Sequence, residues 1–454
     1  MYNASVALRR SSLFERLRVS CETPEKLYVL FALLYFLGAF SPSDVGENMA
    51  SRQWQFDRIS YFAQIIVFAV LALLLFVRWK AISRGLRHAF WPLAICAFAI
   101  FSAGWSDDPF FTVRRAVVLL ATTVFAIYFG SCFDWDRQIQ IFERLFLVSI
   151  VGSVLMIVFA PQFGVSHDMH MGALKGMFSH KNLLGRQMAL GILTVVIGKP
   201  LGMPRWLRGA SVLAALPLLV LAHSAGALLS LVIVIGTYTM LSIPRPAYRS
   251  SPPLWLGLLP LLLVGGALLI TNAGTFLSLL GRDSSLTGRV PLWIAIEHAI
   301  SQRFWLGYGY ALFWVRQTGS LQEVVATGWN ALSAQNGYLD LALDLGMAGF
   351  VLFVCSLVSA VRHGFQALRS KGIRTPSWPL LLIVFFAVQN IHESDLLRLG
   401  TFMWIPFVAT SVALSLMNAK ASIHLVESEP RQERTHAWAA DPEPPESGIP
   451  AYES

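Results

Sequence analysis

Basic side chains gather in polar segments that separate long apolar runs of the chain. Arg289 lies in residues 272–337, which form by far the longest polar connection between two such runs. Arg115 lies in a second polar segment, and Lys181 and Arg186 lie in a third. A guanidinium binds an anion through paired N–H donors and keeps its charge at neutral pH. These residue types therefore predict a site for an anionic substrate.

The residues from Ser179 to Arg186 have the features of a phosphate-binding helix start. Ser179 can cap a helix that begins near His180, and the unpaired N–H groups of a helix start favour an anion. Asn182 and Arg186 are four residues apart and share one helix face. The alternative interpretation is that His180, Lys181 and Arg186 contact the headgroups of ordinary membrane lipids.

The composition indicates what kind of protein must position these residues. Hydrophobic residues make up 55% of the 454 residues, and charged residues make up only 13%. A soluble domain of this size does not need so much apolar surface. Runs long enough to cross a bilayer predict an all-α integral membrane protein with about twelve transmembrane helices. These runs lie near residues 26–41, 60–78, 88–104, 113–132, 142–160, 183–199, 209–222, 224–242, 254–271, 338–361, 378–392 and 399–417.

The distribution of Lys and Arg predicts which helix ends face the cytoplasm. With both termini cytoplasmic, that side holds 23 of the 35 Lys and Arg residues, as the positive-inside rule requires. The other 12 lie on the outer side and concentrate in the segments that carry Arg115, Arg186 and Arg289. Binding of an anion is the simplest reason for them. The net charge of +9 otherwise reflects topology and gives no case for nucleic acid.

The same pattern divides the chain into five parts. Residues 1–25 form a cytoplasmic segment in which no cleaved signal peptide is expected, and residues 26–271 hold the first nine transmembrane helices. Residues 272–337 form a large periplasmic loop with short amphipathic helices, and residues 338–417 hold the last three transmembrane helices. Residues 418–454 are rich in Pro and Glu and predict a disordered cytoplasmic tail.

Within the loop, Arg289 precedes a short amphipathic pattern. One face of the predicted helix carries the apolar residues Leu292, Ile296, Ala299 and Ile300. Such a helix can lie in the membrane interface, where it would hold Arg289 over the bilayer surface. The alternative is a solvated Arg on a surface helix.

Particular motifs fill these polar segments. Residues 176–186 contain Ser-His-Lys-Asn, residues 286–309 contain Thr-Gly-Arg, and residues 334–340 contain Gln-Asn-Gly-Tyr-Leu-Asp. Residues 105–115, which begin with Trp-Ser-Asp-Asp-Pro, form a weaker fourth motif. Together the four motifs resemble the O-antigen ligase and polymerase family of bacterial membrane glycosyltransferases, especially its exopolysaccharide-polymerase branch. They follow the family's order and fall on the expected sides of the membrane.

The resemblance implies a metal-independent enzyme that needs no cofactor. It would move a glycan from undecaprenyl diphosphate to an acceptor hydroxyl at the periplasmic face of the bacterial inner membrane. The leading interpretation is a polymerase whose acceptor is a second lipid-linked repeat unit, with chain-length regulators and export proteins as suggested partners. One alternative is a ligase that passes the glycan to lipid A core or to a protein. The other is a flippase, although a transporter is expected to carry charged residues inside its helices.

Displacing a diphosphate develops negative charge, which Arg stabilises through bidentate contacts. We therefore predict that Arg289, Arg186, Gln335 and His180 act in catalysis. The residues predicted to bind substrate are Lys181, Asn182, Asn336, Tyr338, Arg115 and Glu393.

The chain departs from the family pattern at Gln335. Family members commonly carry a His at this position, as the proposed base or orienting group for the attacking hydroxyl. Gln cannot accept a proton at neutral pH, although it can hydrogen-bond a hydroxyl. Either proton removal does not limit the rate, or another group performs it, and the candidates are His180, Glu393 and Asp395. The alternative for both carboxylates is a pair with Arg398.

Metal binding is not expected. The outer segments offer no compact carboxylate cluster for Mg²⁺. His167, Asp168 and His170 lie close together in the sequence but lack a convincing fourth ligand. The four Cys residues show no metal-binding spacing.

Overall fold

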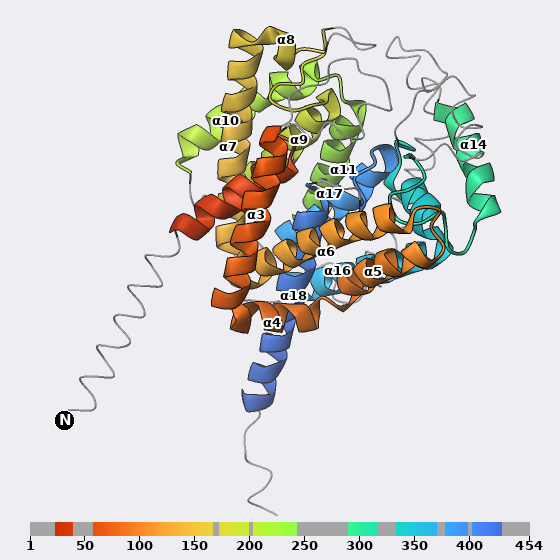
Figure 1. The fold of residues 1–454 in the computed structure, drawn as a ribbon. Coiled ribbons are helices and arrows are strands. Elements are labelled where there is room, and N and C mark those ends of the chain that lie inside the picture. The colour runs from red at the N-terminus through yellow and green to blue at the C-terminus, as the bar shows by residue number, and fades with distance from the viewer. Residues whose placement is uncertain are drawn as a thin grey trace, which may run out of the picture.

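Figure 1 shows a bundle of helices in the computed structural model of the chain. The structure describes residues 23–39, 58–166, 172–198, 203–242, 289–315, 333–369, 377–397 and 402–428. Helices form the regular elements of these ranges, and an isolated β-bridge joins Val165 to Leu174.

The helices alternate with short turns through most of the described chain. Residues 23–36 are helical, and Ser102–Gly104 form a 3-10 turn, η1. The other helices are Arg58–Val77 (α3), Trp79–His88 (α4), Phe90–Phe101 (α5), Pro109–Cys132 (α6), Trp135–Phe159 (α7), Pro161–Gly164 (α8), Lys181–Ile197 (α9), Arg205–Leu221 (α10), Ala225–Ser242 (α11), Arg289–Gln302 (α14), Gly337–Arg369 (α16), Trp378–His392 (α17) and Trp404–Ser428 (α18).

These helices confirm an all-helical, multi-pass membrane protein. Helix is present in every predicted span except 254–271, which lies outside the described residues. Five described helices are long and apolar enough to cross a membrane, and the number is six if α4 and α5, which meet at 82°, form one broken span. The total of twelve stays a prediction. α18 continues to Ser428, so the tail expected from residue 418 begins as helix.

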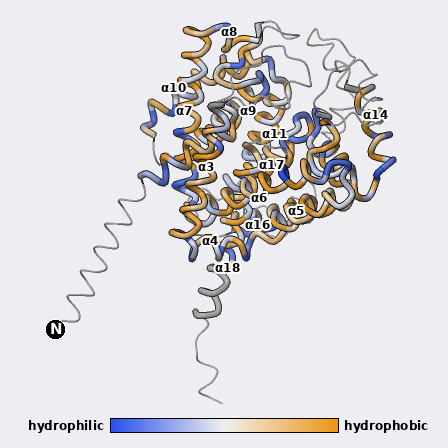
Figure 2. The backbone as a smooth tube through the Cα atoms, in the orientation of Figure 1, coloured by the Kyte–Doolittle hydropathy of each residue, from blue (hydrophilic) through white to orange (hydrophobic). Residues whose placement is uncertain are grey.

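The centre of the bundle is the contact between α6 and α18. A Cβ atom added at Gly130 of α6 would lie 2.4 Å from the carbonyl oxygen of Ala409 on α18. Small residues let membrane helices approach this closely. The indole Nε1 of Trp404 donates to Thr123 Oγ1 at 2.9 Å across the same contact. Figure 2 shows that apolar residues run along most of α5 and α6, as a membrane-embedded centre requires.

α6 is one of the long apolar helices of the bundle. It begins at Pro109, which suits the first position of a helix, and the Asp108 side chain caps it by accepting from the Phe111 backbone N–H at 3.1 Å. Its 24 residues make a helix about 36 Å long, enough to cross a bilayer. α6 is therefore a candidate membrane span by itself.

α16 is broken at Gly346, and residues 304–309 form backbone hydrogen bonds with α16 on both sides of the break. The backbone N–H groups of Tyr308 and Gly309 donate to the carbonyl oxygens of Leu343 and Asp344 at 2.8 and 3.0 Å. On the other side of the break, the N–H groups of Met347 and Ala348 donate to Phe304 and Trp305 at 2.8 and 3.1 Å. Backbone groups freed inside a membrane helix need such partners, so residues 304–309 are anchored to α16.

Glycine is required at both sides of this junction. Gly346 has φ +62° and Gly307 has φ +67°, a region that favours glycine. A Cβ atom at Gly307 would lie 2.6 Å from the Gly346 nitrogen. The backbones therefore touch, and the anchor leaves little room for movement.

The helix predicted from the amphipathic pattern is present as α14, and its placement in the membrane interface stays a prediction. Leu292, Ile296 and Ala299 are fully buried against residues that include Tyr308 and Phe313. The apolar face therefore packs on the protein. The anchored segment 304–309 supplies this covering surface, which the sequence pattern of one helix does not reveal.

Candidate active site

The first predicted motif forms the start of α9. The helix begins at Lys181, and His180 caps it because its Nδ1 accepts from the Asn182 backbone N–H at 3.2 Å. The expectation that Ser179 is the cap is therefore wrong by one residue. Lys181 is buried and His180 is exposed, so the basic groups surround a helix start whose N–H groups favour an anion.

Glu393 joins three predicted segments. Its Oε1 accepts a short hydrogen bond from the Asn182 side chain on α9, and its backbone carbonyl accepts from the Gly337 N–H at 3.0 Å. Glu393 itself follows the last residue of α17, and Gly337 is the first residue of α16. The start of α9, the end of α17 and the start of α16 therefore meet at one point.

The turn before α16 presents Gln335. This residue has φ +52°, a conformation that is uncommon outside glycine and that occurs often at functional sites. Its Nε2 donates to Ser333 Oγ at 3.3 Å. The next residue, Asn336, caps α16 by accepting from the Tyr338 and Leu339 N–H groups at 3.0 and 3.3 Å. Gln335 is thus held beside Glu393 by a capped turn.

Asp340 connects this turn to the large loop. Its Oδ1 accepts from the Ala334 N–H at 3.0 Å and from the Trp314 indole at 2.8 Å. The indole of Trp293 on α14 donates to the Ala334 carbonyl at 2.9 Å. α14 therefore lies against the turn that carries Gln335. Sequence reasoning gave Asp340 no role of its own, although an acidic residue in the first helical turn is a capping signal.

Arg186 forms a buried ion pair with Asp395. The two side chains are 3% and 6% exposed, and they join α9 to the turn after α17. Arg398, the alternative partner for the carboxylates, lies outside the described residues. Within the described residues, Arg186 Nε and Asp395 Oδ2 have no hydrogen-bond partner. The Asp395 N–H donates to Asn390 Oδ1 at 3.1 Å, so Asp395 is held through both its side chain and its backbone.

The hydroxyls of Tyr338 and Tyr310 donate to backbone carbonyls of α17 and of the turn after it. The Tyr338 hydroxyl donates to the Ala387 carbonyl on α17 at 2.7 Å. The Tyr310 hydroxyl donates to the Leu397 carbonyl, just after Asp395. Burial raises the pKa of Tyr310 well above its usual range, so the phenol stays neutral and keeps its donor. Sequence reasoning missed Tyr310, because nothing in the chain marks the partner of a buried phenol.

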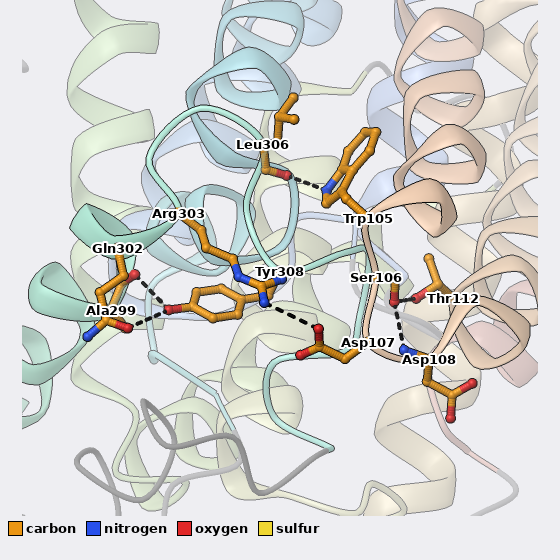
Figure 3. Close-up of polar contacts among 10 residues, drawn as sticks. All are labelled: Trp105, Ser106, Asp107, Asp108, Thr112, Ala299, Gln302, Arg303, Leu306 and Tyr308. Atoms are coloured by element: carbon orange, nitrogen blue, oxygen red, sulfur yellow. Dashed lines mark hydrogen bonds and ion pairs between the residues drawn. The ribbon is translucent and has the colours of Figure 1, made fainter.

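The weaker fourth motif lies beside the far end of α14 (Figure 3). The Trp105 indole donates to the Leu306 carbonyl at 3.0 Å, and Arg303 pairs with Asp107 at 3.2 Å. Arg303 also lies over the Tyr308 ring, 4.8 Å from its centroid. These contacts connect the start of α6 to the anchored segment 304–309.

Two predicted arginines lie at different distances from this meeting point. Arg289 is the first residue of α14, and its side chain lies outside the described part of the chain. Because α14 packs beside Ala334 through Trp293, its N-terminal end lies close to the Gln335 turn. Arg115 lies on α6, half-buried, with its guanidinium 4.6 Å from the Phe111 ring centroid.

Metal ligands do not gather in the described ranges. No group of three or more His, Cys, Asp or Glu side chains is placed there to hold a metal ion. His167, Asp168 and His170 lie outside these ranges.

The comparisons with known proteins agree with the motifs. Residues 210–354 match the family described as O-Antigen ligase. The chain is also 26% identical over 371 residues to the exopolysaccharide production protein ExoQ of Rhizobium meliloti (strain 1021). The aligned residues make up 75% of this chain and 82% of that protein. The chain is thus similar to O-antigen ligases over residues 210–354 and to an exopolysaccharide production protein over most of its length. The family match includes Arg289 and Gln335, whereas the start of α9 and the turn after α17 complete the site from outside it.

Proposed function

We propose that the chain is a polysaccharide polymerase that extends a glycan held on undecaprenyl diphosphate. The hydroxyl oxygen of an acceptor sugar, carried by a second lipid-linked repeat, bonds to the anomeric carbon of the donor glycan. The bond from that carbon to the diphosphate oxygen breaks, and the lipid diphosphate leaves with the bonding electrons. The meeting of three polar segments at Glu393 carries this proposal, and the name of the relative from Rhizobium meliloti supports exopolysaccharide as the product.

The leaving diphosphate needs positive charge. In the proposal, Arg289 and Lys181 contact its oxygens, and the positive end of the α9 helix dipole adds partial positive charge. Arg186 is engaged by Asp395, but a guanidinium has five N–H donors and one carboxylate does not use them all. Its unpartnered Nε is the group we propose for the substrate. No bound metal is required for this charge balance.

The acceptor hydroxyl must lose its proton as it attacks. We propose that the Gln335 amide orients the hydroxyl and that Glu393 accepts the proton. Glu393 is the acidic residue whose backbone carbonyl accepts from the Gly337 N–H, two residues after Gln335. Asp395 is less suited because its charge is already balanced by Arg186 in a buried pair. His180, at the exposed start of α9, is the second candidate.

Substitution of Gln335 tests the orienting role. Gln335→Ala is expected to lower the rate of glycan transfer while binding of the lipid-linked donor persists, because the donor is held by Arg186 and Arg289. Gln335→His is expected to keep substantial activity, since imidazole hydrogen-bonds in the same place and also accepts a proton. Transfer rates and donor affinity are measured separately on purified protein.

The pH dependence separates orientation from base catalysis. With Gln335 no ionisation at this position affects the rate, whereas Gln335→His adds an acidic limb near the unperturbed His pKa of about 6.5. Activity is lost below that pH, where the imidazole is protonated and cannot accept. Wild-type activity in Gln335→Ala would remove Gln335 from the site and leave proton transfer to His180 or Glu393 alone.

Deletion of the gene tests the function itself. A polymerase is expected to leave single repeat units on the lipid carrier and no long chains on the surface or in the medium. A ligase, which the family description also favours, leaves long chains stranded on the carrier. A flippase leaves single repeats on the cytoplasmic side of the membrane. Size analysis of the polysaccharide, with the lipid-linked pool assayed by side, decides among the three.

The proposal places the site at the periplasmic face of the inner membrane, with both termini in the cytoplasm. Reporter fusions at residues 320 and 430 are expected to report opposite sides, because 23 of the 35 Lys and Arg residues fall on the side assigned to the termini. A periplasmic alkaline phosphatase signal at 320 and a cytoplasmic fluorescent signal at 430 are the expected pair. The same side for both fusions would overturn this topology.

A further inference from the structure

The helix α4 carries a stripe of basic residues at the opposite end of the bundle from the candidate site. Lys80, Arg84 and Arg87 are spaced by four and three residues, which places them on one helix face, and all three are exposed. Gly85 and Ile82 occupy the other face and are buried. α4 therefore turns its cationic side away from the protein.

The orientation of this stripe is fixed by close packing. A Cβ atom at Gly85 would lie 1.9 Å from Ser131 Oγ, near the end of α6, and His88 Nδ1 lies 2.9 Å from Ser415 Oγ on α18. α6 runs from the Trp105–Asp108 turn at one end to Ser131 at the other. The end of α6 that contacts α4 therefore lies about 36 Å along that helix from the Trp105–Asp108 turn.

The surroundings of α4 place it at the membrane surface. Phe76 and Val77, at the end of α3, are 84% and 66% exposed, as residues that face lipid are expected to be. Trp79 begins α4 with 57% of its surface exposed, and Trp is enriched at the bilayer interface. α4 also bends by 82° from α5. The cationic stripe therefore starts where the lipid-facing surface of α3 ends.

The charges of the stripe are not neutralised by the described protein. Arg78, which precedes α4, pairs with Glu25 at 2.6 Å. Lys80, Arg84 and Arg87 have no carboxylate partner among the described residues. Arg84 and Arg87 bond only to backbone carbonyls of their own helix. We propose that this stripe binds the phosphate groups of anionic phospholipids in the leaflet opposite the active site.

A second occupant is conceivable from charge alone. Residues 429–454 contain six Asp and Glu residues against two Arg residues, so this tail is acidic. Lipid is favoured because Trp79 and the exposed end of α3 flank the stripe with apolar surface, which suits an interface better than an acidic peptide. Occupancy by the tail is an outcome that the experiment distinguishes.

Native mass spectrometry of the purified, delipidated full-length chain tests the proposal. The probes are phosphatidylglycerol and phosphatidylcholine with identical acyl chains, offered at equal concentration. Lys80→Gln/Arg84→Gln/Arg87→Gln is expected to lower the preference for phosphatidylglycerol roughly tenfold or more, since each surface cation contributes several-fold. The preference of wild type should also fall as salt is raised.

Two further variants test whether a loss of the lipid preference comes from a general loss of charge or from misfolding. Arg144→Gln/Arg205→Gln/Arg362→Gln removes three exposed charges from separate helices and is expected to keep the preference. Lys80→Arg/Arg84→Lys/Arg87→Lys keeps the charge and should bind like wild type, which shows that a loss in the Gln variant is not misfolding. The proposal would be overturned if both Gln variants lost the phosphatidylglycerol preference equally, or if the α4 variant kept it. It would also be overturned if wild type bound the lipid only after residues 429–454 were removed.

Discussion

Arg289→Lys is expected to lower the rate of glycan transfer about a hundredfold, even though the positive charge is kept. Lys offers a point charge, whereas the leaving diphosphate is best stabilised by the paired donors of a guanidinium. The structure supports this position, because α14 is packed against the Gln335 turn through Trp293 and Ala334. Initial rates are measured with a purified lipid-diphosphate-linked repeat unit as both donor and acceptor.

Arg303→Lys is the matched control for this prediction. Arg303 lies just beyond the other end of α14, and its ion pair with Asp107 is half exposed, with both side chains at 38%. Exposed pairs contribute little, so the rate is expected to change a few-fold at most. Normal polymer from a correctly inserted Arg289→Ala variant would show that Arg289 is not catalytic. Equal losses in the Lys variants at 289 and 303 would point to general disturbance of the loop.

Arg208→Ala is expected to destabilise the fold by about 3–5 kcal/mol, because it strands a buried carboxylate. Arg208 on α10 pairs with Glu143 on α7, and the Glu143 side chain is only 1% exposed. The same guanidinium donates to the Val195 and Gly198 carbonyls at the end of α9. Three helices thus depend on one side chain. The free energy of unfolding is measured by denaturing titration in mixed micelles.

Arg205→Ala provides the comparison, since Arg205 is exposed on the same helix and its removal should change stability by no more than about 0.5 kcal/mol. Glu143→Leu/Arg208→Leu is expected to recover part of the loss, because no charge is then left buried. If Arg208→Ala is no more destabilising than Arg205→Ala, Arg208 does not hold these helices together.

Hydropathy predicted the helices, and the motifs predicted which segments carry the candidate site, because both signals depend on residues close in sequence. The apolar runs gave helices across the described part of the chain. The motifs at His180 and Gln335 each fell at a helix start, where capping residues and polar side chains leave a local signal. These local signals also account for the errors, since Ser179 and His180 are both able to cap and only the fold selects one.

Contacts between distant segments were not predictable from the same information. The pair between Arg186 and Asp395 joins residues from α9 and from the turn after α17, and many carboxylates compete for that role in the sequence. The break at Gly346 stands inside a long apolar run, and its repair by residues 304–309 requires the folded chain. The packing of the apolar face of α14 on Tyr308 and Phe313 was not predictable for the same reason, because a protein surface and a lipid surface select the same apolar face.

The most direct test of the central proposal is the product made by the purified chain alone. Wild-type protein, reconstituted in vesicles with one lipid-diphosphate-linked repeat unit and a chelator, is expected to produce a ladder of lipid-linked oligomers by gel and mass analysis. Arg289→Ala and Glu393→Gln proteins should leave the repeat unit unextended. A wild-type protein that binds the repeat unit yet makes no oligomer, or an Arg289→Ala protein that makes the full ladder, would contradict the account.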